Sequence, residues 1–339
     1  MLRTAFITLE GSDMMKKVKS RQARKEVIVA PPSLIRLAVV MTGGPDTTKG
    51  SLVLSTDSGG GIIFNCGEGS IRYVDMDRNL REEAGVMKSN LRTIFITHKS
   101  WECIAGLHGL ALSNHRRALN SDYHNEQQEE KGLSDFDIEL FGPDGIEDYI
   151  HMTKNISKSQ TDQPLQYKTV HSKGVYEDSA FTISSIVFEE EKGNLEAKKR
   201  SKEAVGQETV FAYIIKAHPM LPRLNFEKCV DLGFTSGAAV VDLVNGMNVT
   251  LADGRVITHD MVVDKAQGDE RPILIIDCPN KHFLKSVTSS KDLEQYMTLD
   301  PAKSLAMVCH FTPSEIYNTD DYQAWMKRYI TPQSYTIFF

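Results

Sequence analysis

The stretch IFITHKSWECIAGL, residues 94–107, places a histidine, a serine, an acid and a thiol within six positions, 98–103. Its first residues are apolar and strand-like, and its end is an apolar-Gly-Leu turn that leads into a helical pattern. Imidazole, carboxylate and thiolate groups are the protein ligands of zinc. The stretch is therefore either a metal centre with unusual ligands or the retained part of a centre that has lost its metal.

The composition limits the classes of function that remain open. The 339 residues, 41% apolar and 25% charged, suffice for one large domain or two modest ones. No apolar run approaches the roughly 18 residues of a membrane-spanning helix, so we expect no membrane partner. A net charge of -6 excludes attraction of the whole surface to a polyanion. Five cysteines without a C-x-x-C pair indicate reduced thiols and no zinc ribbon.

Residues 1–33 are expected to be a basic tail, and three uses of this tail stay open. It could be a mitochondrial presequence, although Glu10 and Asp13 are unusual because such peptides contain few acids. The alternatives are a nuclear localisation signal and a solvated segment without a targeting role. We therefore expect a mitochondrial or a nuclear location, or both. The basic cluster consists of Lys16, Lys17, Lys19, Arg21, Arg24 and Lys25.

Apolar runs along residues 34–339 predict one domain. Strands are expected in succession and then in alternation with helices, which favours an α/β sandwich with sheets inside and helices outside. Residues 189–208 carry many charges and no apolar stripe, so we expect a mobile insertion there. The expected strands lie at 34–41, 51–57, 61–65, 91–97, 136–141, 165–172, 181–188, 209–217, 271–279, 304–313 and 334–339.

A series of motifs resembles one protein family. The motifs are FNCGEG (64–69), the stretch at 94–107, LFGPDGIEDYI (140–150), ILIIDCP (273–279) and VCHFTP (308–313). Together they are similar to the amino-terminal half of long-form tRNase Z, an endonuclease that removes 3′ trailers from precursor tRNAs. The resemblance implies a metallo-β-lactamase-like αββα sandwich over residues 34–339, with a protruding hairpin arm. It also implies that the other half of such a protein is catalytic and holds zinc.

The resemblance gives the turn at 98–103 a meaning. Active family members hold two zinc ions with an H-x-H-x-D-H turn, and the metals lower the pKa of a bridging water. On this sequence the first histidine is His98, the second falls on Ser100, the aspartate on Glu102, and the third histidine on Cys103. A serine hydroxyl is a poor zinc ligand, and glutamate is one methylene longer than aspartate. The resemblance thus implies that the four positions are vestiges of a zinc site and no longer hold metal.

Two further positions extend this interpretation. The family's metal-bridging aspartate falls on Cys278 within Asp277-Cys278-Pro279, and His310 falls where active members carry a histidine that assists the leaving group. We therefore expect no catalytic residue, no metal and no cofactor in this chain. The alternative is a metal-dependent phosphodiesterase whose zinc site is rebuilt from His98, Glu102, Cys103 and Cys278.

In the family an arm that grips tRNA protrudes at a place that corresponds to about residues 217–266. Five basic and six acidic residues lie between Lys216 and Lys265, which is little positive charge for a phosphate clamp. The expected RNA contacts are two cations, one aromatic ring and two glycines that offer backbone amides. They are Arg223, Lys228, Phe226, Gly233 and Gly237.

The leading hypothesis is a lobe that binds precursor tRNA and is catalytically silent. It would work with a catalytic tRNase Z half, in cis or in trans, and zinc would reside in that half. We expect this chain by itself not to cleave RNA. A pure protein-interaction scaffold remains a further alternative.

Overall fold

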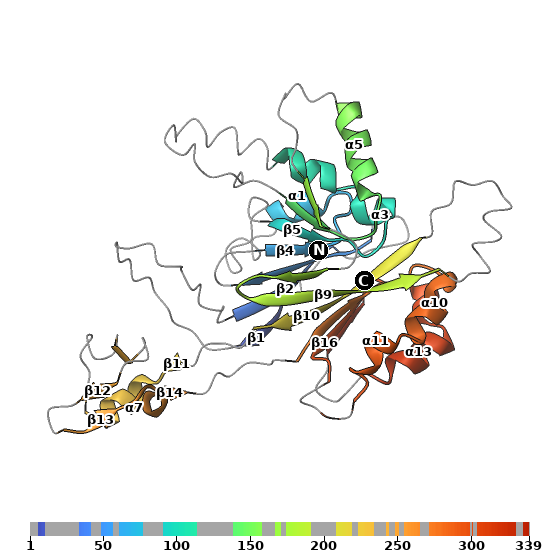
Figure 1. Cartoon of the computed structure of the whole chain (residues 1–339). Helices are drawn as coiled ribbons and strands as arrows, with labels where there is room; N and C mark the ends of the chain where they lie inside the picture. The colour runs from blue at the N-terminus through green and yellow to red at the C-terminus, as the bar shows by residue number, and fades with distance from the viewer. Residues whose placement is uncertain are drawn as a thin grey trace, which may run out of the picture.

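The computed structural model shows two sheets packed face to face, helices outside them and an arm that projects from the body (Figure 1). The described residues are 6–10, 34–41, 49–56, 61–76, 91–113, 138–157, 167–170, 174–190, 208–218, 223–233, 242–243, 248–250, 254–264, 271–298, 300, 304–329 and 335–338.

The first sheet has seven strands whose spatial order follows the chain. They are β1 (Phe6–Glu10), β2 (Leu34–Met41), β3 (Ser51–Thr56), β4 (Gly61–Phe64), β5 (Leu91–Phe95), β6 (Ile138–Phe141) and β7 (Tyr167–Val170). Neighbours are antiparallel from β1 to β4 and parallel from β4 to β7. The start of β3 and the ends of β4 and β5 therefore lie at one edge of this sheet.

The second sheet has six strands. They are β8 (Val175–Glu177), β9 (Phe181–Glu189), β10 (Thr209–Ala217), β15 (Ile273–Ile276), β16 (Met307–His310) and β17 (Tyr335–Phe338), in the spatial order β17-β16-β15-β10-β9-β8. The β15, β16 and β17 strands are parallel to one another. All residues of β15 and β16 are buried, as expected for short apolar runs covered on both faces.

Helices cover the outer face of each sheet. Against the first sheet pack α1 (Ser70–Met76), α3 (Trp101–Ile104), a helical segment at 107–113, and α5 (Ile146–Ser157). Against the second pack α10 (Lys281–Thr288), α11 (Lys291–Glu294), α12 (Ser314–Tyr317) and α13 (Asp320–Met326). Within the described residues, no helix is long and apolar enough to cross a membrane.

A stack of aromatic rings fills the space between the sheets. The Phe95 ring stacks on Phe64 at 5.2 Å between centroids and on Phe141 at 4.5 Å, and it meets Tyr213 of the second sheet edge-on at 4.9 Å. The Tyr213 hydroxyl donates to the carbonyl oxygen of Ile96 at 2.6 Å. The rings bury large apolar surfaces, and the one polar group has a partner, so the two sheets are held in a fixed relation.

The arm has a small hydrophobic cluster of its own. Its elements are β11 (Arg223–Leu224), α7 (Phe226–Asp231), β12 (Val249–Thr250), β13 (Val256–Ile257), α9 (His259–Val262) and β14 (Val263–Asp264). Cys229, Leu243, Ile257 and Val262 are buried together. Figure 1 shows these elements projecting away from the two sheets. The arm is therefore a packed unit with two helical turns, more than the hairpin expected from sequence.

Two boundaries predicted from the sequence need correction. Residues Phe6–Glu10 lie within the expected tail 1–33, yet they form β1 and pair with β2 along its full length. Their sequence FITLE is rich in residues that favour strands. The β9 strand includes Glu189, and Glu190 after it is buried, so the start of the expected insertion belongs to the body. Residues 191–207 of that insertion lie outside the described part of the chain.

Gly106 allows the turn after α3 to lie directly on the loop that follows β4. Its N–H donates to the carbonyl oxygen of Cys66 at 2.8 Å. A Cβ at this position would press against the backbone carbonyl of Gly67 and lie 2.9 Å from that of Cys66. Backbone on both sides cannot yield as a flexible side chain can.

We expect Gly106→Ala to lower the free energy of unfolding by about 1–3 kcal/mol, because it overpacks this contact. Gly109→Ala is the matched control, because Gly109 is exposed in the helical segment and its Cβ would meet nothing within 4 Å. Alanine should raise helix stability there by up to about 1 kcal/mol. Urea unfolding of both variants measures the difference, and equal stability of the two would contradict the contact.

Candidate functional site

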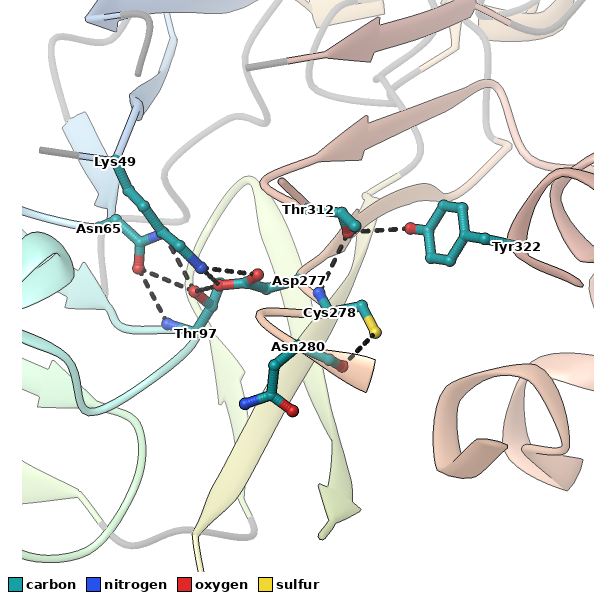
Figure 2. Close-up of polar contacts among 8 residues, drawn as sticks. All are labelled: Lys49, Asn65, Thr97, Asp277, Cys278, Asn280, Thr312 and Tyr322. Atoms are coloured by element: carbon teal, nitrogen blue, oxygen red, sulfur yellow. Dashed lines mark hydrogen bonds and ion pairs between the residues drawn. The ribbon is translucent and has the colours of Figure 1, made fainter. Parts of the chain in front are cut away.

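Four polar residues from distant parts of the chain meet where strands of both sheets end (Figure 2). Lys49 stands just before β3, Asn65 just after β4 and Thr97 shortly after β5. Asp277 directly follows β15 in the second sheet. Since these strand ends lie at one edge of the sandwich, the four side chains converge there. We call Lys49, Asn65, Thr97 and Asp277 the polar cluster.

The centre of the polar cluster is an ion pair. The Lys49 Nζ atom lies 2.8 Å from Oδ1 and 2.7 Å from Oδ2 of Asp277, across 228 positions in sequence. The Asp277 side chain is fully buried and that of Lys49 is 12% exposed. Burial opposes the charge on Lys49, but the attraction and the hydrogen bond of Asp277, together with other nearby acidic groups, outweigh burial and raise the pKa of the lysine. The ammonium is therefore charged at every physiological pH.

Thr97 and Asn65 complete the hydrogen bonds of the carboxylate. The Thr97 hydroxyl donates to Oδ2 of Asp277 at 2.9 Å and accepts from Nδ2 of Asn65 at 3.0 Å. The Asn65 Oδ1 atom accepts from the Thr97 backbone N–H at 2.9 Å. Asn65 adopts a positive φ of 58°, a conformation that asparagine tolerates better than most residues. The cluster is thus a closed network, with each buried partner satisfied.

The turn residues predicted from sequence lie beside this cluster, in different environments. His98 forms an isolated bridge with Val210 of β10, and burial lowers the pKa of its imidazole against the attraction of Asp277. Ser100 precedes α3 as its N-cap residue. Glu102 is exposed, whereas Cys103 is completely buried. Among the described residues, His98, Glu102 and Cys103 form no group that could hold a metal ion.

Cys278 lies on the other side of the strand end from Asp277. Its Sγ lies 3.5 Å from the carbonyl oxygen of Asn280, its backbone N–H donates to the hydroxyl of Thr312, and it packs in the apolar cluster under α10 and α13. Successive residues of an extended chain point to opposite faces. The carboxylate that contacts Thr97 thus belongs to Asp277, one residue before Cys278, which the resemblance matches to the bridging aspartate.

His310 is buried at the end of β16. Its Nδ1 lies 2.7 Å from the Tyr322 hydroxyl, and that hydroxyl lies 3.0 Å from Oγ1 of Thr312 (the latter contact is drawn in Figure 2). Burial lowers the pKa of His310 to about 3, so the ring is neutral at physiological pH. The imidazole therefore works here as a hydrogen-bonding group of the core.

The residues present do not fit a pair of zinc ions. Within the described part of the chain, no group of three or more His, Cys, Asp or Glu could hold a metal. Both carboxylate oxygens of Asp277 are engaged by Lys49. Burial raises the pKa of Cys103 to about 11 and that of Cys278 to about 12, so neither is a thiolate at neutral pH. Zinc binds cysteine as the thiolate, so these raised pKa values oppose the loss of the two thiol protons that the rebuilt site considered above requires.

Sequence reasoning missed three of the four members of the polar cluster and placed the role of the fourth on its neighbour. Lys49 sits in a loop dense in turn formers, and nothing local marks it as a partner of Asp277. The signal that could have found Asp277 was an acid at the end of an all-apolar strand, a place where functional side chains gather.

The residues predicted to touch RNA lie in the arm. Arg223 is in β11 opposite Asp264 of β14, and Lys228 is in α7, where its backbone N–H is bonded to the side chain of Asn225. Phe226 is the first residue of α7. Gly233 follows α7 with a φ of +89°. Gly237 lies outside the described residues. Arg223, Phe226 and Lys228 thus lie on one short stretch of the arm, in β11 and α7.

The two-sheet body and the projecting arm define the class of this fold. It is a metallo-β-lactamase-like αββα sandwich with a protruding arm. The crystal structure of a long-form RNase Z from yeast shares the fold, with a TM-score of 0.53 at 15% identity. That match covers 90% of this chain and 36% of the yeast chain.

Sequence comparison leads to the same group of proteins, and no protein-family model matches the chain. The chain is 23% identical over 315 residues to mitochondrial ribonuclease Z of Drosophila melanogaster, across 93% of this chain and 36% of the relative. It is 24% identical over 359 residues to zinc phosphodiesterase ELAC protein 2 of Homo sapiens, across 94% and 40%. The chain thus spans 40% or less of the length of these relatives. The comparisons thus confirm that the chain is similar to part of long-form ribonuclease Z proteins, at 23–24% identity.

The buried neutral His310 should make the fold sensitive to mild acid. In the unfolded chain a histidine has a pKa near 6.5, so below that pH the unfolded state gains a proton that the folded state does not. The contribution of the neutral His310 to the free energy of unfolding is therefore complete above pH 6.5, and it is lost as the pH falls towards 3. The expected loss is about 1.4 kcal/mol per pH unit, or about 2 kcal/mol between pH 6.5 and 5. Burial of His98 acts in the same direction.

Urea unfolding at pH 7 and pH 5 tests this expectation on the wild-type chain, His310→Gln and the control His151→Gln, an exposed position on α5. His310→Gln should lose less stability between the two pH values than the wild type, whatever its absolute stability. His151→Gln should match the wild type. The idea fails if all three chains show the same difference.

Proposed function

We propose that this chain acts in tRNA 3′-end processing as the lobe of a long-form ribonuclease Z that binds precursor tRNA without cutting it. The observation that carries the proposal is the extent of the match: more than nine-tenths of this chain aligns with 36–40% of ribonuclease Z relatives. An alignment of that shape is what one lobe of a larger protein gives. We place this lobe in the amino-terminal half, on the motifs described above.

The chemistry of the polar cluster supports a lobe without catalytic activity. Cleavage of a phosphodiester by a metallo-enzyme needs cations that lower the pKa of a water and stabilise the leaving oxygen. The charge beside Asp277 is instead an ammonium that is held by both carboxylate oxygens. An ammonium neutralises a carboxylate but offers no open coordination position for water. The lobe therefore supplies binding and position, and the zinc chemistry belongs to a catalytic half, in cis or in trans.

The arm is the part of this lobe that we propose to contact tRNA. It projects from the body in Figure 1, so a duplex can reach it without colliding with the sandwich. Arg223 and Lys228 offer charge for phosphates, and Gly233 is an exposed glycine after α7. Because acids outnumber bases across 216–265, the contact would be local.

The location that we propose is the mitochondrion. The Drosophila relative carries that location in its name. The nuclear location stays a prediction from the basic cluster of the tail, which lies outside the described residues.

Binding without cleavage is the direct test of the proposal. We expect the purified chain to shift a labelled precursor tRNA that carries a 3′ trailer, and the affinity should fall steeply with salt. Arg223→Ala with Lys228→Ala should reduce the slope of log K against log salt by about 2, because each phosphate contact contributes about one. Lys285→Ala with Lys291→Ala, two exposed lysines on α10 and α11, is the matched control.

Three outcomes would redirect the interpretation. Unchanged affinity of the arm variant would remove RNA contact from Arg223 and Lys228. Failure of the wild-type chain to bind tRNA at all would favour an interaction scaffold. Release of the trailer by the purified chain, abolished by a chelator, would make it a metal-dependent phosphodiesterase.

A further inference from the structure

We propose that Lys49 is the permanent cation of the polar cluster. Its ammonium neutralises Asp277 as a bound metal ion would, and the body therefore folds without a metal. The inference rests on the proposed function, because it gives a physical reason why the lobe would lack catalytic activity. It does not depend on RNA binding. Its observations are the burial, the contacts and the charges of the polar cluster.

The first observation is the need for a cation. The Asp277 side chain is completely enclosed, and an enclosed carboxylate without a counter-charge is strongly unfavourable. A metal centre meets this need with a dication. Here the need is met by a side chain that extends from the start of β3 to the end of β15, from one sheet to the other.

The second observation is how completely the carboxylate is engaged. Lys49 contacts both oxygens, and the Thr97 hydroxyl donates to Oδ2. Thr97 is in turn fixed by Asn65, whose amide donates to the same hydroxyl (Figure 2). Outer hydrogen bonds of this kind orient the ligands of metal sites as well. The carboxylate is thus held and oriented with a lysine in the place of the ion.

The third observation is the balance of charge around the ammonium. The carboxylates of Asp277 and of the exposed Glu102 both favour a positive charge on Lys49. His98 on the neighbouring turn could add a second positive charge, but burial lowers the pKa of its imidazole and so disfavours the charged form. One fixed cation therefore suffices, and a dication beside it would be repelled by the ammonium.

A double-mutant cycle in the full chain tests the pair. Lys49→Met should raise the equilibrium constant of urea unfolding by about 100- to 1,000-fold, because it leaves a buried carboxylate alone. Lys49→Met with Asp277→Asn should return to within about tenfold of the wild type, because the charge that needed a cation is gone. Lys99→Met, at an exposed lysine of the same turn, should change the constant by about twofold or less.

The cycle remains decisive if the single variant fails to fold. A folded double variant beside an unfolded single variant supports the proposal. A double variant as unstable as the single variant, or a Lys49→Met chain as stable as the wild type, overturns it.

A cation added from solution provides an independent readout. In Lys49→Ala the missing atoms correspond closely to propylammonium, which should raise the melting temperature of this variant in proportion to the logarithm of its concentration. The wild type should not respond, and n-propanol, which has no charge, should restore neither chain. Equal effects of propylammonium and n-propanol on Lys49→Ala would overturn the role of charge.

Metal analysis of the wild-type chain closes the test. We expect the same unfolding midpoint with and without EDTA, and no increase on addition of zinc chloride. Stoichiometric zinc whose removal by EDTA destabilises the chain would overturn the proposal. None of these readouts involves RNA, so a failure here is distinguishable from a failure of tRNA binding.

Discussion

The ion pair between Lys49 and Asp277 joins the two sheets of the sandwich at the edge where their strands end. Apolar packing alone is non-directional, so it brings the sheets together without fixing which loops face each other. A buried charge pair with short contacts to both carboxylate oxygens is directional, and it allows little sliding. Thr97 and Asn65 extend this constraint to the start of the turn at 98–103, because Thr97 directly precedes it. The Thr97 carbonyl also accepts from the backbone N–H of Phe211 in the second sheet.

The same interaction separates two tasks that a metal ion performs together. A dication beside a carboxylate holds strand ends in place, and it also polarises water and phosphate oxygens. An ammonium retains the first task, because attraction to a carboxylate needs only charge and hydrogen bonds. It cannot perform the second, since all three of its protons are donors and it has no vacant coordination position. On the proposal above, an ammonium in the place of the ion preserves the shape of this edge without supplying hydrolytic chemistry.

The sequence predicted the framework better than the centre. The runs that became β15 and β16 were predictable, because short apolar segments bounded by turn formers have few other uses. The strand β1 was missed because a basic cluster further along the tail dominated the interpretation of residues 1–33. Asp277 was passed over because the motif comparison pointed to its neighbour Cys278, and successive residues of an extended chain face opposite sides. Lys49 could not be found, because its partner lies 228 positions away.

The arm packs independently of the polar cluster, so a lack of catalysis at that cluster does not prevent the arm from binding a ligand. Its elements pack on Cys229, Leu243, Ile257 and Val262, a cluster with no member in the cores of the sandwich. Contacts within the arm therefore set its local shape, and the charges around Asp277 have no direct influence on it. On the proposals above, the body can thus lack metal chemistry while a distant surface of the arm is unaffected. This physical separation would allow one lobe to hold a substrate while another performs the reaction.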